Sequence, residues 1–131
     1  MKVSESALDA KVKRSNPKLG TSLHCACFNG NMEIVKLLIN RGADKESRNV
    51  SGQTPLIVAS LKGHPDVVDY LLNVDASIHP YCHQRRTALH YACKKKHFKV
   101  VKILIEHNAN VNSRDISGNT PAMLEEQPAH C

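Results

Sequence analysis

Four short stretches of similar sequence decide the fold. They read T-S-L-H-C-A-C at 21–27, T-P-L-I-V-A-S at 54–60, T-A-L-H-Y-A-C at 87–93 and T-P-A-M-L at 120–124. Each begins with a threonine, and consecutive threonines are 33 residues apart. A fixed period of this length indicates stacked structural repeats. The same spacing joins Ala43, Ala76 and Ala109, and also Leu38, Leu71 and Leu104.

The apolar pattern within each repeat predicts two short helices and a polar connection. The first helix follows the threonine, whose side chain can cap its first turn. The second helix carries a broad apolar stripe, as Ile34, Val35 and Leu38 illustrate. One helix pair is too small to bury that stripe, so we expect stability to come from neighbouring repeats. The first helices are predicted at 22–29, 55–62 and 88–95, and later second helices at 65–73 and 98–106.

The period and the T-P-L-H-x-A pattern resemble the ankyrin repeat family, from about Asn16 to Leu124. The resemblance implies an all-α solenoid of stacked helix-turn-helix units with protruding β-hairpin loops. It also implies the following division: an N-terminal segment at 1–15, expected to be partly disordered, repeat one at 16–48, repeat two at 49–81, repeat three at 82–114, and a partial fourth repeat with a C-terminal tail at 115–131.

Some positions depart from the family pattern. Second helices of this family usually end on a glycine in the left-handed conformation, which Gly42 supplies in repeat one. Asp75 and Asn108 replace it later, and Lys96 replaces the glycine between the two helices of repeat three. Asp and Asn tolerate this conformation best among the other residues, so we expect the geometry to be kept.

Composition excludes several classes of protein. The 131 residues suit one domain, and only 4% are aromatic, so Leu, Ile, Val, Ala and Cys must form most of the core. The longest apolar runs are far below the ~20 residues of a membrane span. The start of the chain has no apolar segment typical of a secretory signal. Five cysteines do not form a complete disulfide framework, so we expect a reduced protein in the cytoplasm, the nucleus or both.

No residue pattern predicts catalysis. His24 and His90 stand where, by resemblance, the family uses a structural histidine, and repeat two has Ile57 at that position. His90 and Cys93 are three residues apart on one predicted helix, the spacing of a possible Cys–His pair. Both occupy framework positions of the family, so we expect no catalytic residue.

A metal site is not predicted either. His79, Cys82 and His83 are close in sequence, but zinc usually takes four converging ligands. The residues 33 positions before and after them include no Cys or His. We therefore expect no metal or other cofactor, and Cys82 is predicted to be an exposed, oxidisable thiol.

The positive charge of the chain is concentrated in one repeat. Between Asp75 and Glu106 there are seven basic residues and no acidic residue, whereas the rest of the chain carries 11 basic and 12 acidic residues. A solvated basic face explains this pattern, and nucleic-acid binding is the alternative. The resemblance divides the charges between two surfaces. Arg86, Lys94 and Lys95 are expected on the concave side, where they would steer a partner, and Lys99 and Lys102 are expected on the outer helix. No aromatic ladder accompanies them, so nucleic acid is the weaker interpretation.

The resemblance implies a binding face made of hairpin tips and first-helix ends. Apolar Phe28 and Leu61 are predicted to be exposed anchors beside a basic rim, which indicates a protein partner with apolar and acidic parts. We therefore predict a monomeric adaptor, scaffold or inhibitor that binds another protein and no membrane. The predicted contact residues are Phe28, Asn29, Val50, Ser51, Gln53, Leu61, Lys62, His83, Gln84, Arg86, Lys94, Lys95, Ile116, Ser117 and Asn119.

Asn112 is a predicted modification site. It lies in L-I-E-H-N-A-N-V-N, with Leu104 eight residues before it. This resembles the hairpin site at which an asparaginyl hydroxylase modifies many ankyrin repeats. Glu46 and His79 occupy the same place in the earlier repeats, which leaves Asn112 as the candidate.

Overall fold

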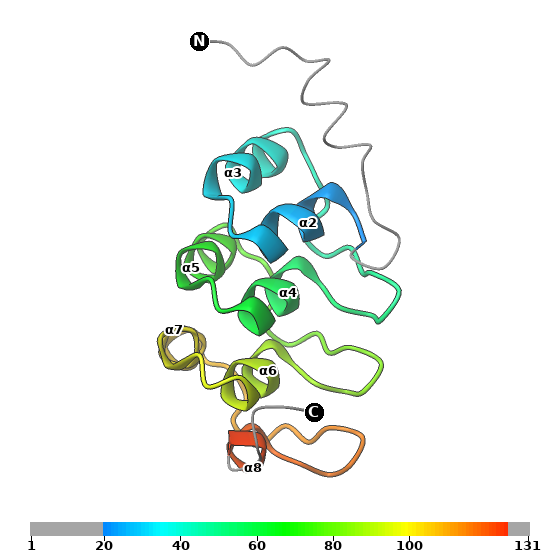
Figure 1. The fold of residues 1–131 in the computed structure, drawn as a ribbon, viewed down its shortest axis with the longest axis vertical. Coiled ribbons are helices and arrows are strands. Elements are labelled where there is room, and N and C mark those ends of the chain that lie inside the picture. Colours follow the sequence, from blue (N-terminus) through cyan, green and yellow to red (C-terminus); the bar gives the residue numbers. More distant parts are fainter. Residues whose placement is uncertain (1–19, 126–131) are drawn as a thin grey trace.

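The computed structural model describes residues 20–125, in which seven helices form a stack (Figure 1). The predicted segment 1–15 and the tail beyond 125 lie outside the described residues. The prediction of an all-α solenoid is confirmed. The inner helices are α2 (Ser22–Asn29), α4 (Pro55–Lys62), α6 (Ala88–Lys94) and α8 (Pro121–Glu125), and the outer helices are α3 (Met32–Asn40), α5 (Pro65–Asn73) and α7 (Phe98–Glu106).

The inner helices begin at the periodic threonines, as predicted. The side-chain oxygens of Thr21, Thr54 and Thr87 accept hydrogen bonds from the third backbone N–H of the helices that follow, at 3.3–3.4 Å. In α2 and α6 the histidine at that third position also accepts a bond from the threonine backbone N–H, which completes a reciprocal cap.

The turns adopt the expected left-handed backbone even where glycine is absent. Asp75 and Asn108 both have φ 68°, and Lys96 has φ 61°, close to the 84° of Gly42. A lysine has no local side-chain bond to stabilise this conformation, so Lys96 is the least favourable of the three replacements.

The core lies between the two rows of helices. Leu38, Leu71 and Leu104, the periodic leucines of the outer helices, are buried there. Each inner helix packs on the next inner helix, and outer helices α3, α5 and α7 pack in the same order. The repeats are therefore stabilised by their neighbours, as the short helices require.

Two histidines also join neighbouring repeats. His64 Nε2 donates to the Phe28 carbonyl oxygen at 2.9 Å, and His97 Nε2 donates to the Leu61 carbonyl oxygen at 3.1 Å. Their rings lie against Gly30 and Gly63, where an added Cβ would come within 2.6 Å of a ring atom. These glycines are therefore needed for close approach as well as for backbone conformation.

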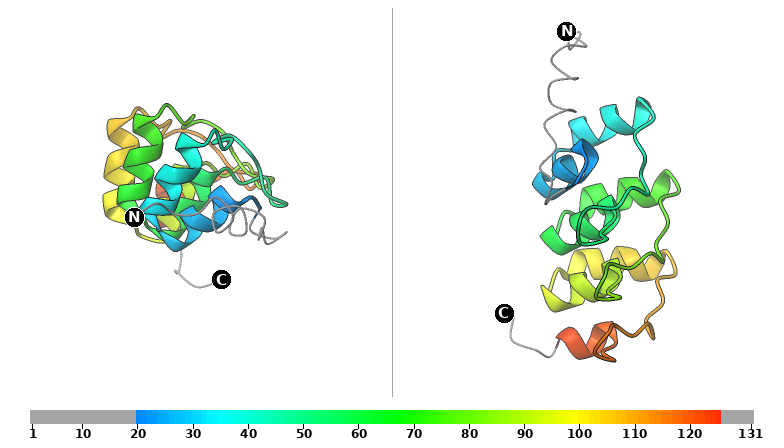
Figure 2. Two further views of the ribbon diagram at one scale, coloured as in Figure 1. Left: turned by 90° about the horizontal axis from the view of Figure 1, so that it is seen from above. Right: turned by 90° about the vertical axis from the view of Figure 1, so that its right-hand side faces the viewer.

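The loops between repeats project to one side of the stack (Figure 2). They are hairpin-like, but within residues 20–125 the only strand-type pairing is an isolated bridge between Tyr81 and Thr87. Backbone bonds close the loops at 49–53, 82–86 and 115–119, with N to O distances of 3.0, 3.0 and 2.9 Å. We refer to these as the first, second and third hairpins.

Candidate protein-binding face

The inner helices and the three hairpins together form one side of the molecule, which we call the concave face (Figures 1 and 2). The hairpins are joined in a continuous row. His83 N donates to Ser51 O at 3.0 Å, and Ile116 N donates to Gln84 O at 2.9 Å. These bonds fix the tips relative to one another, so the face is preorganised for binding.

His24 and His90 connect the inner helices to the hairpins. His24 Nε2 donates to Gln53 O at 2.7 Å, and His90 Nε2 donates to Asn119 O at 2.9 Å. Burial lowers the pKa of both imidazoles, against a smaller opposing effect of these carbonyls. Both nitrogens of each ring have partners inside the protein, which suits a structural role rather than proton transfer.

The neighbouring thiols are not activated as nucleophiles. Burial raises the pKa of Cys27 to about 12 and contributes most to raising the pKa of Cys93 to about 11. The thiolate is the reactive form of cysteine, so it is disfavoured at both positions at neutral pH.

Most of the predicted contact residues are accessible. Val50 and Ile116 lead the hairpin tips, with 66% and 71% of their surfaces exposed. Gln53 and Asn119 are partly buried because their backbone carbonyls accept the histidine bonds. The other accessible contact residues on this face are Asn29, Ser51, Lys62, His83, Gln84, Lys95 and Ser117, with Lys94 partly buried.

The two predicted anchors are half-buried rather than exposed. Phe28 and Leu61 both pack against the core. The ring of Phe28 is also covered by Lys62, whose Nζ lies 4.3 Å from the ring centroid. Both residues end an inner helix at a repeat junction, so the next repeat covers them. The exposed apolar groups of the face are instead Val50 and Ile116.

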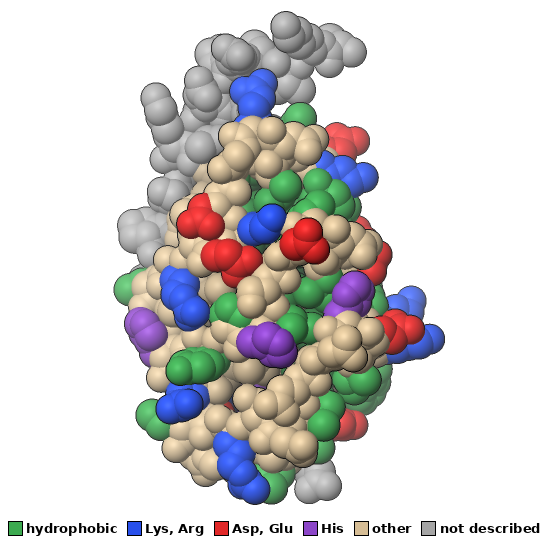
Figure 3. All heavy atoms as spheres, turned by 180° about the vertical axis from the view of Figure 1, so that it is seen from behind, with side chains coloured by type: hydrophobic (Ala, Val, Ile, Leu, Met, Phe, Trp, Pro, Cys, Tyr) green, Lys and Arg blue, Asp and Glu red, His purple; other side chains and the backbone are tan. Residues whose placement is uncertain are grey.

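Acidic residues are unevenly distributed between the two rows of helices. Inner helices α2, α4 and α6 contain no Asp or Glu, whereas the short inner helix α8 ends on Glu125 and each outer helix contains at least one acidic residue. Acidic side chains are visible on the opposite face, interspersed with Lys, Arg and His (Figure 3). Lys62, Lys94 and Lys95 therefore give the ends of α4 and α6 a local positive charge, whereas the neighbouring α8 ends on Glu125.

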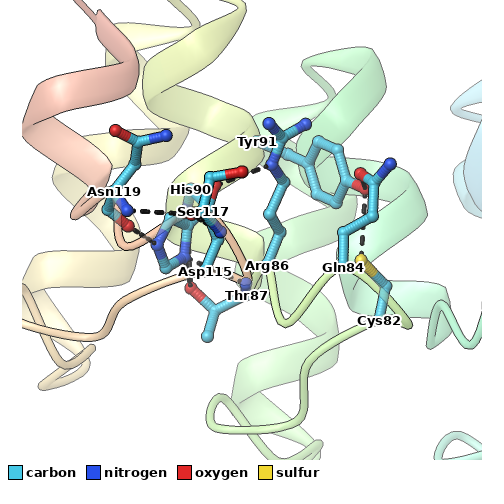
Figure 4. Close-up of polar contacts among 9 residues, drawn as sticks. All are labelled: Cys82, Gln84, Arg86, Thr87, His90, Tyr91, Asp115, Ser117 and Asn119. Atoms are coloured by element: carbon cyan, nitrogen blue, oxygen red, sulfur yellow. Dashed lines mark hydrogen bonds and ion pairs between the residues drawn. The ribbon is translucent and has the colours of Figure 1, made fainter.

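Arg86 does not belong to this free positive rim. Its Nε lies 3.1 Å from Asp115 Oδ2, and the two side chains are 17% and 0% exposed (Figure 4). Burial alone would raise the pKa of Asp115, but hydrogen bonds from the Asn119 and Ser117 backbones and from Arg86 hold this pKa below its ordinary value. Arg86 therefore contributes little free charge to the rim, and its part in steering a partner stays a prediction. Asp115 is 29 residues away from Arg86 in the chain, and the sequence analysis did not identify it as a partner of that arginine.

Asp115 also closes the third hairpin through its side chain. The second hairpin has no carboxylate or amide at the equivalent position. Asp115 Oδ1 accepts from the backbone N–H groups of Ser117 and Asn119 at 3.0 and 2.9 Å. Asn49 does the same in the first hairpin. Cys82 stands at this position in the second hairpin, where its sulfur lies 3.2 Å from the hydroxyl oxygen of Tyr91.

Cys82 is therefore not the exposed thiol that the sequence predicted. Only 3% of its surface is accessible, because it lies beneath the second hairpin and against Tyr91 (Figure 4). Burial, followed by the contact with Cys82, raises the pKa of Tyr91 to about 12. The pair forms a buried floor rather than a reactive centre.

A pocket of about 340 Å³ opens above this floor, between the first and second hairpins. The predicted contact residues form most of its wall, whereas Cys82 and Tyr91 were not predicted to take part. Tyr91 occupies the variable position of T-A-L-H-Y-A-C, where the other repeats have Cys25 and Val58. The large side chain at this position was the sequence signal that could have indicated its part in the pocket. The lining residues are Val50, Ser51, Gln53, Cys82, His83, Gln84 and Tyr91.

The predicted modification site lies outside the pocket. Asn112 is exposed in the loop after α7, where its backbone N–H donates to Asn110 Oδ1 at 2.9 Å. Its side chain is accessible to an enzyme, and its modification stays a prediction.

Two other classes of site have no counterpart in residues 20–125. Nowhere in this range do three or more His, Cys, Asp or Glu side chains gather as a metal site would require. None of its helices combines the length and apolarity of a membrane span.

Comparison with known proteins identifies the repeats. A family model for ankyrin repeats in three copies matches residues 5–82, and a single ankyrin repeat model matches residues 84–116. Human ankyrin repeat and KH domain-containing protein 1 is 40% identical over 103 residues, which are 77% of this chain and 4% of that protein. Mouse inversin is 34% identical over 125 residues, covering 95% of this chain and 11% of inversin.

A kinase is also among the similar proteins. The tyrosine-protein kinase HTK16 of Hydra vulgaris is 30% identical over 106 residues, which are 79% of this chain and 14% of the kinase. In all three relatives the chain spans a small part of a longer protein. Ankyrin repeats generally bind other proteins and are generally not catalytic. The period, the fold and these matches agree, and the chain belongs to the ankyrin repeat family.

Proposed function

We propose that this chain is a non-catalytic module that binds a partner protein on its concave face, as an adaptor, scaffold or inhibitor. The observation that carries the proposal is the distribution of charge: three of the four inner helices, α2, α4 and α6, contain no acidic residue, and α8 carries only Glu125. A surface of one sign attracts partners of the opposite sign and speeds their association. The partner is therefore a protein with an acidic docking segment.

Apolar groups on the same face complement the charge. Val50 and Ile116 project at the hairpin tips, and the pocket beside Val50 offers a concave site. Interfaces commonly combine a few anchors in pockets with a polar rim. In this proposal the lysines guide the encounter and the tips with the pocket retain the partner.

Nucleic-acid binding through the basic third repeat is the alternative function. Lys94 and Lys95 lie at the end of an inner helix, whereas Lys99 and Lys102 lie on outer helix α7. A nucleic acid bound mainly through phosphates would respond to the loss of charge on either surface. A protein docked on the concave face would respond only to the loss of charge at Lys94 and Lys95.

Two matched double variants test the proposal. Lys94→Glu with Lys95→Glu changes the concave face, and Lys99→Glu with Lys102→Glu makes the same change of net charge on the outer face. Partners captured by the wild-type protein are identified by mass spectrometry, and their binding kinetics are measured at two salt concentrations. We expect the concave variant to slow association by about tenfold or more and to lose most of the salt dependence.

The outer variant is the control and should bind nearly as the wild type does. Equal weakening by both variants would contradict the concave-face assignment. A gel-shift assay with mixed DNA and RNA completes the test. If the wild-type protein shifts nucleic acid and both double variants lose this shift, the result supports nucleic-acid binding as the function.

A further inference from the structure

The pocket between the first and second hairpins lies where the chain departs from its own repeat pattern. Asn49 and Asp115 close their hairpins through a side-chain oxygen, but Cys82 stands between them in the period. Gly52 and Gly118 have left-handed backbones, and Arg85 takes that conformation at φ 60° in the second hairpin. The first of these departures replaces a side-chain acceptor near the pocket with a thiol, and the second replaces a glycine with an arginine.

Two glutamine amides at the pocket use their oxygen atoms inside the protein. Gln53 Oε1 accepts from Asn49 Nδ2 at 3.0 Å, and Gln84 Oε1 accepts from the Tyr91 hydroxyl at 3.5 Å. The side-chain NH₂ group of each glutamine is therefore the part that can donate a hydrogen bond to a ligand. Figure 4 shows Gln84 beside Tyr91 and Cys82.

Further donors lie at the rim. The Ser51 hydroxyl and the His83 ring line the same pocket. The imidazole of His83 is positioned by Gly52, where an added Cβ would lie 2.6 Å from the ring. Ring nitrogen, hydroxyl and amide groups at one site favour a ligand that is rich in acceptors.

The charge around the pocket selects an anion. No Asp or Glu lines it, and the nearest described acidic side chain of the hairpins, Asp115, is buried against Arg86. Lys95 follows Tyr91 by one helical turn and adds positive charge on the same face. Bonds from N–H donors to a carboxylate are charge-assisted and are about twice as strong as neutral ones.

We propose that this pocket binds the side-chain carboxylate of an Asp or Glu in an acidic segment of the partner protein. The carboxylate oxygens accept from the NH₂ groups of Gln53 and Gln84 and from the rim. A phosphate suits the site less well, because a doubly charged group favours a guanidinium partner and no described Arg lines the pocket. This inference rests on the proposed function, since it names the partner chemistry of the same face.

Phage display of random twelve-residue peptides against the full chain supplies the probe. A selected peptide is then synthesised with an amidated C-terminus, so that carboxylates come only from its side chains. We expect selected sequences to share an Asp or Glu at one fixed position. Replacing that residue by Asn or Gln should weaken binding by about tenfold, and replacing it by phosphoserine should not restore binding.

Gln84→Glu is the matching change in the protein. Glutamate keeps the oxygen that accepts from Tyr91, so the fold is retained, but a negative oxygen replaces the NH₂ donor. We expect the affinity for the acidic peptide to fall by about tenfold or more. Asn40→Glu is the control, because Asn40 is exposed at the end of outer helix α3 and belongs neither to the pocket nor to the concave face. It should change affinity by less than about threefold.

The outcomes separate this inference from the proposed function. If both glutamate variants weaken binding equally while Lys94→Glu with Lys95→Glu still slows association as proposed, the assignment of the pocket is wrong and the concave face stands. If the outer-helix variant is as damaging as the concave one, or if selection yields no binding peptide, both proposals fail. Equal affinity for the acidic peptide and its amide analogue also overturns the carboxylate assignment.

Discussion

Leu71→Ala is the sharpest test of how the array is stabilised. Leu71 lies on α5 of the central repeat and has 0% of its surface exposed. Helix α5 packs on α4 of its own repeat and on outer helices α3 and α7. The substitution therefore removes apolar contacts from the middle of the core rather than from one end.

The expected loss follows from cavity formation. Leu→Ala changes in buried sites destabilise by about 2–5 kcal/mol, and more where the surroundings cannot collapse. Packed helices on both sides restrict relaxation around Leu71, so we expect about 3–5 kcal/mol. For a domain of this size the urea dependence is about 1.5 kcal/mol per M, so the midpoint should fall by about 2–3 M. That is a large part of the stability of a small domain.

Urea denaturation followed by circular dichroism measures this shift. Ile116→Ala is the control, since Ile116 is 71% exposed at a hairpin tip and should change stability by less than about 0.5 kcal/mol. The reasoning fails if Leu71→Ala leaves the midpoint unchanged or shifts it no more than the control does.

Four further expectations concern single sites. Burial lowers the pKa of His24 and His90 below the ordinary 6.5 in the folded state, so the unfolded chain takes up protons first. Stability should be complete above about pH 6.5 and decline as the pH falls below it; a thermal midpoint that is flat between pH 8 and 5 would contradict this. Asp115→Asn keeps the hairpin acceptor but leaves the Arg86 charge unpaired, and should lower the free energy of unfolding by about 1–3 kcal/mol in urea titrations at pH 7, whereas wild-type stability would argue against the ion pair. Cys82 should resist iodoacetamide in the native protein, as judged by mass spectrometry of labelled peptides, and labelling as fast as in urea would show that it is accessible. Asn112 should gain a single oxygen on co-expression with an asparaginyl hydroxylase, and an unmodified peptide would end that hypothesis.

Much of the fold is determined by local sequence. Thr21, Thr54 and Thr87 cap helices whose first turns lie within three residues of them, so the cap can be predicted without a tertiary model. The left-handed backbone positions can also be predicted from local sequence, because Asp75 and Asn108 stand at the positions equivalent to Gly42 in the repeat period. The repeat period then carries each local pattern into the stack, since identical units bury the same face.

The binding face required the tertiary structure. Arg86 and Asp115 are 29 residues apart, and nothing in either local sequence shows that their charges cancel. The burial of Phe28 depends on how Lys62 of the next repeat covers it. Burial of Cys82 likewise depends on the direction of the Tyr91 side chain. Sequence period fixes which residues share a level of the stack, whereas exposure, charge pairing and pocket shape depend on side chains that meet across repeat boundaries.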